Sequence, residues 1–245
     1  MTKPARRIGA YGVDAPAVIL TFAVIAAVLL VVTALVFALE VPVLPWITLA
    51  GGLFCALTVA NLLYTTLAGK FAVWSEILGR LGLRGDEKVL DVGCGRGAVL
   101  IATASRLPAG RAVGVDLWSG GDQSGNAPGV TTANAEAEGV RDRVRVVTGD
   151  ATSLPFGDAS FDLVVSSMAI HNIEDRARRG AALREVVRVL RPGGRVALVD
   201  FMVVGQYPEI LGGAGLTELR IRPLGWRFWY GGPWLSASLV TGIRG

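Results

Sequence analysis

Two long runs of apolar residues open the chain, and no charged residue interrupts either of them. The first run covers residues 15–39 and the second covers residues 46–69, with Glu40 and two prolines in the short turn between them. At 1.5 Å per residue, each run makes a helix long enough to cross the roughly 30 Å hydrocarbon core of a membrane. The pattern predicts a transmembrane helical hairpin in residues 1–70. Asn61 is the most polar residue of the second run, and we expect it to form a hydrogen bond between the two helices.

Basic residues flank the hairpin on one side only. Lys3, Arg6 and Arg7 precede the first run and Lys70 follows the second, whereas the turn carries a single acidic residue. By the positive-inside rule, both termini and the rest of the chain are expected in the cytoplasm. A cleaved signal peptide has a shorter apolar core of about 7–15 residues and would leave the second run unexplained. Buried helices of a soluble domain are the other alternative, but two runs of this length favour membrane insertion.

A different pattern begins after residue 70. Residues 71–83 predict an amphipathic linker helix, and from Lys88 onward short apolar strands alternate with helical segments. This alternation predicts an α/β domain in residues 71–245, with a mostly parallel sheet and helices on both faces. We expect helices at about 97–107 and 175–190, the second one ended by the turn 191–194. The expected strands are 88–92, 111–115, 143–147, 161–166, 195–200, 216–221 and 236–243.

The stretch 89–97 reads VLDVGCGRG and predicts a buried strand that runs into a glycine-rich turn. Gly93, Gly95 and Gly97 can adopt a positive φ and have no Cβ, so a ligand can approach the backbone closely. The helix that follows directs free N–H groups toward such a ligand. Gly93, Gly95 and Ala98 also fit the weak dinucleotide pattern G-x-G-x-x-G/A. The turn by itself therefore leaves a nicotinamide dinucleotide and other nucleotide-type ligands open.

The three glycines, with Asp91 just upstream, resemble the first motif of the class I S-adenosylmethionine (SAM) methyltransferases. In that family the acid lies near the cationic methionine end of SAM. The resemblance continues in order along the chain from about Leu83 to the C-terminus. It implies a Rossmann-like sheet of seven strands with the last one antiparallel, preceded here by the two-helix hairpin. It also implies SAM as the cofactor and methyl transfer as the activity.

The later landmarks of the resemblance assign expected roles at the ends of successive strands. Asp116 and Leu117 follow the second strand, where the family's acid binds both ribose hydroxyls, and a carboxylate accepts two such hydrogen bonds. Asp150 resembles the residue that contacts the adenine amino group. Ligands of open α/β sheets bind at these carboxyl ends of strands. The expected cofactor-binding residues are Asp91, Gly93, Gly95, Gly97, Asp116, Leu117, Asp150, Ala151 and Ser166.

His171 is the only histidine of the chain, and it follows the fourth strand. Because histidine titrates near neutral pH, it could take a proton from an acceptor that must lose one. We therefore expect His171 to be the catalytic residue, with a helix cap or a loop hydrogen bond as its alternative role. Two further segments stay open. Residues 118–126 form either a lid or a flexible connection, and the aromatic residues 226–230 line a substrate pocket, face the bilayer or pack in the core.

Composition narrows the function further. The chain has 245 residues, of which 52% are hydrophobic, and a net charge of +4 with a pI near 9.4. It has no block of Lys and Arg that would indicate nucleic-acid binding, and its two cysteines and one histidine predict neither a disulfide framework nor a metal site. We expect a methyltransferase acting on a small hydrophobic or membrane-associated acceptor. A noncatalytic SAM-sensing module and an NAD-dependent oxidoreductase remain as alternatives, and the acceptor atom stays open.

Overall fold

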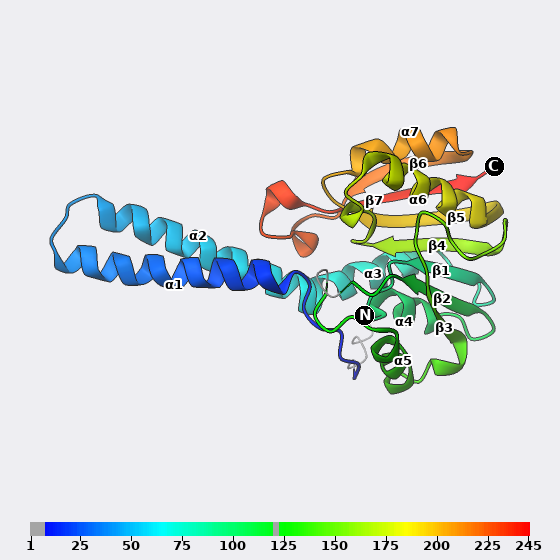
Figure 1. Cartoon of the computed structure of the whole chain (residues 1–245), viewed down its shortest axis with the longest axis horizontal. Helices are drawn as coiled ribbons and strands as arrows, with labels where there is room; N and C mark the ends of the chain where they lie inside the picture. Colours follow the sequence, from blue (N-terminus) through cyan, green and yellow to red (C-terminus); the bar gives the residue numbers. More distant parts are fainter. Residues whose placement is uncertain (1–7, 120–122) are drawn as a thin grey trace.

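The computed structural model describes residues 8–119 and 123–245, and it consists of a helical hairpin that projects from an α/β domain (Figure 1). Helices α1 (Pro16–Ala38) and α2 (Leu44–Tyr64) run antiparallel and form the hairpin. A hydroxyl pair joins them, because Thr33 Oγ1 donates to Thr48 Oγ1 at 2.8 Å. Lys3, Arg6 and Arg7, on which the predicted membrane orientation depends, lie outside the described residues.

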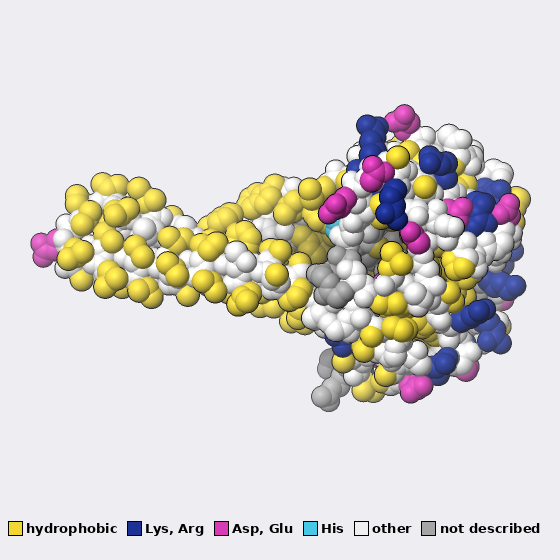
Figure 2. Space-filling view, in the orientation of Figure 1, with side chains coloured by type: hydrophobic (Ala, Val, Ile, Leu, Met, Phe, Trp, Pro, Cys, Tyr) yellow, Lys and Arg dark blue, Asp and Glu magenta, His cyan; other side chains and the backbone are white. Residues whose placement is uncertain are grey.

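The hairpin exposes apolar side chains on almost all sides. Figure 2 shows hydrophobic side chains along the length of the hairpin, an acidic side chain at its tip, and the other visible charged side chains on the α/β domain. Leu20, Val31 and Leu57 are each at least 60% exposed. Among the described residues, these helices are two candidates of sufficient length and apolarity to cross a membrane, the second one continuing to Arg80.

The second hairpin helix enters the α/β domain without a break. Helix α2 passes through a π-helical turn, η1 (Thr65–Gly69), directly into α3 (Lys70–Arg80). The domain boundary expected between residues 70 and 71 therefore falls inside one long helix, and the linker helix predicted to reach residue 83 ends at Arg80. The prediction had divided one helix in two because the apolar run ends at Lys70, although the backbone continues.

Seven strands form one sheet in the order β3-β2-β1-β4-β5-β7-β6. Only β7 is antiparallel to its neighbours, as predicted. The strands are β1 (Lys88–Val92), β2 (Arg111–Asp116), β3 (Val144–Thr148), β4 (Phe161–Ser167), β5 (Leu190–Asp200), β6 (Leu216–Pro223) and β7 (Ser238–Arg244). The remaining α-helices are α4 (Ala98–Ala104), α5 (Pro128–Ala137), α6 (Arg176–Val189) and α7 (Tyr207–Gly213). Short 3-10 helices span Arg141–Arg143, Ile170–Asn172, Val204–Gln206, Trp226–Phe228 and Pro233–Leu235.

Alternate residues of the strands pack into two cores, one on each face of the sheet. Val89, Leu163 and Ala197 pack with α3 and α4, whereas their neighbours Leu90 and Val164 pack with α6 and α7. Successive side chains of a strand point to opposite faces, so strands buried on both faces are apolar at nearly every position. This is the architecture that the alternating pattern predicted.

Two predicted boundaries were wrong. Strand β5 begins at Leu190 rather than Arg195, because Leu190 already pairs with Phe161 of β4. The next pair is Leu163 with Arg195, so the register of the two strands shifts between these pairs. Residues 191–194 therefore bulge within the strand instead of separating it from α6, and Gly193 has a φ of 74° there. Helix α4 ends at Ala104, three residues before the predicted end.

The segment between β6 and β7, residues 224–237, leaves the sheet and lies beside the base of the hairpin (Figure 1). We call it the β6–β7 loop. Gly69 of the long helix permits this approach, since a Cβ on it would lie 2.1 Å from the carbonyl oxygen of Arg227. The side chain of Arg227 also pairs with Glu76 of α3 at 2.7 Å.

Substituting the two glycines at the domain end of the long helix tests this close packing. Gly69→Ala is expected to lower the thermal unfolding midpoint, because the added Cβ forces the loop away at a cost of about 1–3 kcal/mol. Gly79→Ala is the matched control, since nothing lies within 4 Å of its added Cβ. There the gain in helix propensity, about 1 kcal/mol, should raise the midpoint. Equal shifts in both variants would contradict the packing described here.

Candidate functional site

A cavity of about 540 Å³ lies at the carboxyl ends of β1, β2 and β4. Its volume falls within the range of small-molecule sites. The chain order β3-β2-β1-β4 reverses direction between β1 and β4, and open α/β sheets bind ligands at such a switch point. The cavity is lined by residues from the glycine turn, from the ends of the strands and from two segments outside the sheet, which include Asp14, Lys70, Phe71, Trp74, Asp91, Gly93, Gly95, Asp116, Leu117, Asp150, Ala151, Ser167, His171, Phe201 and Tyr230.

The glycine turn forms the wall of the cavity next to β1. Gly93, Gly95 and Gly97 all have a positive φ, of 72°, 48° and 86°. A Cβ on Gly93 would lie 2.1 Å from the Cβ of Ala169, so the turn also needs glycine for space. The Gly93 N–H donates to the carbonyl of Val115 at 2.8 Å, which ties the turn to β2. The turn is thus built as the sequence predicted, and it leaves the backbone open to a ligand.

Asp91 is a buried carboxylate inside this wall, only 1% exposed. Neither of its oxygens has a hydrogen-bond partner among the described residues. Burial, and secondly the negative charge of Asp116, raise the pKa of Asp91 to about 8, against a smaller opposing effect of the Leu100 backbone N–H. An unpaired buried carboxylate is costly unless a cation or a donor reaches it. Because Asp91 lines the cavity, such a partner can come from a ligand.

The carboxylate of Asp116 is held in place by the turns around it. Its Oδ2 accepts from the Gly95 N–H at 2.8 Å and its Oδ1 accepts from the Trp118 N–H at 2.6 Å. Oδ1 also accepts from the Asn126 side-chain amide at 3.3 Å, so Oδ2 is the oxygen that keeps a further lone pair for a ligand hydroxyl. Leu117 beside it is 62% exposed and lines the cavity, which places an apolar surface next to this carboxylate.

Asp150 lines the cavity on the β3 side but already has two partners. Its Oδ1 accepts from the Thr152 N–H at 2.8 Å, and its Oδ2 pairs with Arg178 at 2.9 Å. The backbone hydrogen bond from Thr152 is the main reason that the pKa of Asp150 lies below its usual range. Ala151 is adjacent in the lining. Asp150 is therefore ionised and fixed at the edge of the cavity.

Two expected site residues lie behind the cavity wall. Ser166 is 2% exposed, and its hydroxyl donates to the Val92 carbonyl at 2.7 Å, which joins β4 to β1. Its neighbour Ser167 lines the cavity instead, because successive strand residues face opposite sides. Gly97 is the N-terminal cap residue of α4 and shapes the turn without lining the cavity.

His171 faces the cavity as part of a His–Asp pair. Its Nδ1 lies 2.6 Å from Oδ1 of Asp200, whose side chain is 2% exposed. The Asp200 carboxylate is fixed in turn, because Oδ2 accepts from the Tyr207 hydroxyl at 2.8 Å and from the His171 N–H at 3.1 Å. With Nδ1 bound to the carboxylate, the other ring nitrogen, Nε2, is the one that can accept a proton.

Aromatic rings form a wall beside His171. Its imidazole packs edge-to-face on Phe201 with centroids 4.5 Å apart, and Phe201 stacks on Tyr230 at 5.8 Å. Trp74 lies nearby, where its indole N–H donates to the hydroxyl of Ser167 at 2.8 Å. Cys94 adds an apolar surface, since burial raises the pKa of its thiol well above the usual range. One side of the cavity is therefore suited to an apolar, planar molecule.

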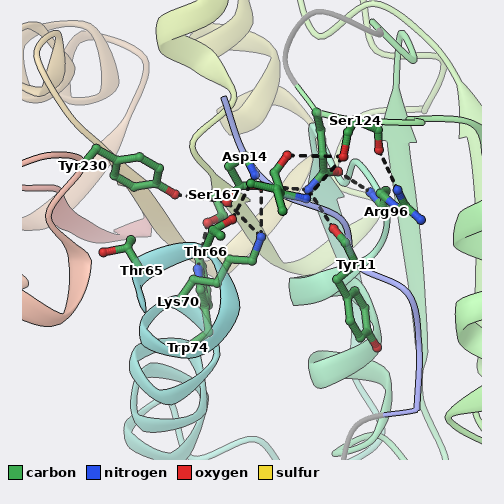
Figure 3. A network of polar contacts seen from close by, with 12 residues as sticks. Tyr11, Asp14, Thr65, Thr66, Lys70, Trp74, Arg96, Ser124, Ser167 and Tyr230 are labelled. Atoms are coloured by element: carbon green, nitrogen blue, oxygen red, sulfur yellow. Dashed lines mark hydrogen bonds and ion pairs between the residues drawn. The ribbon is translucent and has the colours of Figure 1, made fainter. Parts of the chain in front are cut away.

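Asp14 closes the cavity by joining four distant segments (Figure 3). Its carboxylate pairs with Lys70 at 2.8 Å and accepts from the Gln123 side chain at 2.9 Å and from the Tyr230 hydroxyl at 3.4 Å. Its N–H donates to the Thr66 hydroxyl at 2.9 Å. Residues 8–14 thus form a strap across the site, and Gln123 bonds it to the glycine turn through the Arg96 N–H.

Four residues that hold this site together, Asp14, Lys70, Gln123 and Asp200, are not among the predicted site residues. Asp200 ends β5 at the carboxyl edge of the sheet, so the rule for ligand sites in open sheets could have indicated it. Asp14, Lys70 and Gln123 carried no such signal, because their pairing depends on how the hairpin folds back onto the domain. The loop 118–126, expected as a lid or a flexible connection, contacts the strap through Gln123 and Ser124, while its residues 120–122 lie outside the described ones.

Comparison with known proteins identifies the class. Residues 90–198 match the family described as "Methyltransferase domain". The 27-O-demethylrifamycin SV methyltransferase of Amycolatopsis mediterranei is 38% identical over 133 residues, which cover 53% of this chain and 44% of that protein. The ubiquinone/menaquinone biosynthesis C-methyltransferase UbiE of Dinoroseobacter shibae is 36% identical over 134 residues, which cover 54% and 50%. This chain therefore spans about half the length of these curated relatives.

A solved structure supports the fold over a longer part of the chain. Geranyl diphosphate methyltransferase in complex with SAM superposes with a TM-score of 0.57 at 17% identity, covering 71% of this chain and 84% of that one. At 17% identity this superposition shows the fold, and together with the family match over residues 90–198 it supports a class I SAM-dependent methyltransferase domain. Residues 90–198, from β1 into β5, belong to the methyltransferase-domain family.

Removing the charge of Asp14 tests whether the strap holds the site closed. Asp14→Asn leaves Lys70, whose side chain is 8% exposed, without its counter-ion, and unpaired buried charges are strongly destabilising. We expect faster hydrogen exchange of the amides of residues 8–13. Asp86→Asn is the matched control, because Asp86 pairs with Arg84 at the surface and both side chains are more than 60% exposed. Unchanged exchange in Asp14→Asn would show that the strap does not depend on this pair.

Proposed function

We propose that the chain transfers a methyl group from SAM to a small hydrophobic acceptor that reaches it from a membrane. The observation that carries the first half is Asp91, a carboxylate buried in the cavity wall with no partner of its own. The sulfonium and ammonium groups of SAM supply the positive charge that this position lacks. A dinucleotide would instead bring a pyrophosphate toward Asp91 and Asp116, and like charges repel strongly in a buried site.

The residues around the cavity fit the rest of SAM. Gly93 and Gly95 expose backbone beside Asp91 for the methionine part, while Gly97 and Ser166 support that wall from behind. Asp116 keeps a lone pair on Oδ2 for a ribose hydroxyl, and the Asn126 amide on Oδ1 is the weaker bond that a second hydroxyl would replace. Leu117 offers an apolar surface to the adenine ring. Asp150 and Ala151 lie at the far end, where the adenine amino group would meet a fixed carboxylate. These assignments follow the family's pattern of binding and the order of the residues in the cavity.

The charge of Asp91 should favour the cation of SAM over the neutral thioether S-adenosylhomocysteine. Asp91→Asn is expected to weaken SAM binding about tenfold or more at pH 8, because a charged hydrogen bond contributes about 1.5–3 kcal/mol. Binding of S-adenosylhomocysteine should change much less, since only its ammonium group remains positive. Isothermal titration of both ligands with both proteins gives the comparison. An equal loss for the two ligands would mean that Asp91 does not recognise the sulfonium.

For the transfer itself, the protein has to align the acceptor with the bound methyl group and remove a proton where the acceptor carries one. SAM supplies an electrophilic methyl group on sulfur, so positioning contributes much of the rate. His171 can accept the proton at Nε2, because Asp200 holds Nδ1 and stabilises the imidazolium that results. The aromatic rings of Phe201 and Tyr230 would hold a planar acceptor beside it.

Replacing His171 separates proton removal from cofactor binding. His171→Ala is expected to lower turnover at least tenfold, as general bases contribute about 10²–10⁴-fold to the rate, with an unchanged Kd for SAM. Asp200→Asn should lower turnover in the same direction, because Asp200 positions the ring. The assay is methyl incorporation from labelled SAM into its acceptor. Normal turnover in His171→Ala would remove His171 from the mechanism.

The membrane half of the proposal is supported by the surface of the hairpin. Helix α1 buries only Ala26, Thr33 and Val36, so it does not have the buried surface of a soluble core helix. Trp46 and Tyr64 lie near the two ends of α2, where aromatic residues favour the membrane interface. With Lys70 and Arg80 at the domain end of the hairpin, both termini and the catalytic domain would lie in the cytoplasm. An anchored enzyme then acts at a high local concentration near lipid.

The relatives agree with a small apolar acceptor, since one is named for a quinone pathway and the other for a rifamycin. The test is transfer of tritiated methyl groups from SAM into the lipid and small-molecule fractions of membranes that contain the full chain. We expect label in a hydrophobic small molecule, and none with His171→Ala. SAM binding without any labelled product would favour a noncatalytic SAM-sensing module. Binding of NAD in place of SAM would favour an oxidoreductase.

A further inference from the structure

Three polar side chains of the long second helix bind the β6–β7 loop, two of them in α2 and the third in η1. We call these three residues the polar stripe. Thr58, Asn61 and Thr65 are spaced three and four residues apart, so they lie on one face of the helix. Asn61 was expected to bond to the other hairpin helix. Its Oδ1 instead accepts from the Gly231 N–H at 3.2 Å, and the interhelical pair is formed by Thr33 and Thr48.

The two threonines bind loop carbonyls. Thr65 Oγ1 donates to the Trp229 carbonyl at 2.6 Å, and Thr58 Oγ1 donates to the Gly231 carbonyl at 3.5 Å. Within the loop, the Tyr230 N–H donates to the Leu235 carbonyl at 3.0 Å. These backbone groups are therefore satisfied by protein rather than by water. Irregular backbone is tolerated at membrane depth only under that condition.

The outer side of the loop is apolar and aromatic. Trp234 is 63% exposed and stacks on Phe54 of α2 with ring centroids 5.7 Å apart. Trp226 is 57% exposed and stacks on Tyr64 at 5.2 Å. The sequence from 228 to 243 contains no charged residue. Exposed indoles on an uncharged loop, continuous with the apolar surface of the hairpin, fit lipid better than water.

Trp226 and Trp234 stack on residues at different levels of the long helix, and these levels set the depth of each indole in the membrane. Trp46 and Tyr64 lie about 27 Å apart along the helix axis, close to the roughly 30 Å thickness of a hydrocarbon core. The Trp226–Tyr64 pair therefore marks the cytoplasmic interface when Trp46 marks the opposite one. Phe54 lies between these two levels, so the indole stacked on it lies on the membrane side of the interface.

We infer that residues 231–236 of the β6–β7 loop insert into the cytoplasmic leaflet as a re-entrant loop, whose inner side is bound by the polar stripe of α2 and η1 and whose outer side contacts lipid. This inference rests on the membrane placement of the hairpin in the proposed function. Tyr230, at the start of the inserted residues, lines the cofactor cavity. The insertion thus brings the aromatic side of the cavity to the lipid surface, where a hydrophobic acceptor can enter without crossing water.

Spin labels report the depth of single positions in the full chain, reconstituted into phosphatidylcholine and phosphatidylglycerol vesicles. The labelled variants are Trp234→Cys in the loop, Val31→Cys in α1 and Asp142→Cys on the domain surface, made with Cys55→Ala and Cys94→Ala. At Trp234→Cys and Val31→Cys we expect the label to collide more with oxygen than with an aqueous nickel chelate. At Asp142→Cys, whose native side chain is 78% exposed, we expect the reverse.

The outcomes separate the two claims. Collisions typical of lipid at Val31→Cys but of water at Trp234→Cys would overturn the inserted loop and leave the hairpin in the membrane. Collisions typical of water at both would overturn the membrane placement and the loop together. Whether the domain binds SAM is measured by titration on the same samples, so a failure of cofactor binding is seen separately.

A conservative variant tests whether the polar stripe holds the loop in place. Adding Thr65→Val to the Trp234→Cys chain removes the hydroxyl that binds the Trp229 carbonyl while keeping the side-chain shape, and it should abolish the excess of oxygen collisions. Thr21→Val is the matched control, because the Thr21 hydroxyl bonds only to the carbonyl of Ala17 in its own helix at 2.9 Å. An unchanged depth in Thr65→Val, with lipid-like collisions kept, would show that the stripe does not hold the loop in place.

Discussion

A buried carboxyl group without a hydrogen-bond partner among the described residues is the constraint around which the site is built. Asp91 lies near the carboxyl end of β1, the strand between β2 and β4. The sheet shields its side chain from water and from other donors. Its burial raises its pKa to about 8, so the folded protein binds a proton there that the unfolded chain would release above pH 4. This group therefore lowers the free energy of unfolding as the pH rises from about 4 toward 8. A cation in the cavity would recover it, which is why the site is suited to SAM.

The rest of the molecule holds other groups around that carboxylate. The glycine turn exposes backbone next to it, and the Asp14 carboxylate gathers the strap, Lys70, Gln123 and Tyr230 across the opening. The long helix forms one arm of the hairpin and also carries Lys70, which lines the cavity. The hairpin is therefore connected directly to the cavity wall. In the proposed function, this connection would keep the cofactor site close to the membrane surface.

Local patterns predicted most of the fold, because strand and helix periods are written in consecutive residues. The two apolar runs, the seven strands and the glycine turn appear as expected, whereas the reversed β7 was implied by the resemblance to the class I methyltransferases. The errors came from single-residue and long-range effects. Strand alternation puts Ser167, not Ser166, in the cavity, and pairing with Phe161 starts β5 at Leu190. Asp14, Lys70 and Gln123 acquire their roles only from contacts between distant segments, which no local pattern encodes.

The most direct measurement is the number of protons released when SAM binds. Titration calorimetry at pH 7, in buffers of different ionisation enthalpy, gives this number for the native protein and for Asp91→Asn. Because burial raises the pKa of Asp91 to about 8, the group is mostly protonated at pH 7, and it must lose that proton to face a cation as a carboxylate. The account predicts a release approaching one proton for the native protein, absent in Asp91→Asn. The same proton count in both proteins would contradict a site built on Asp91.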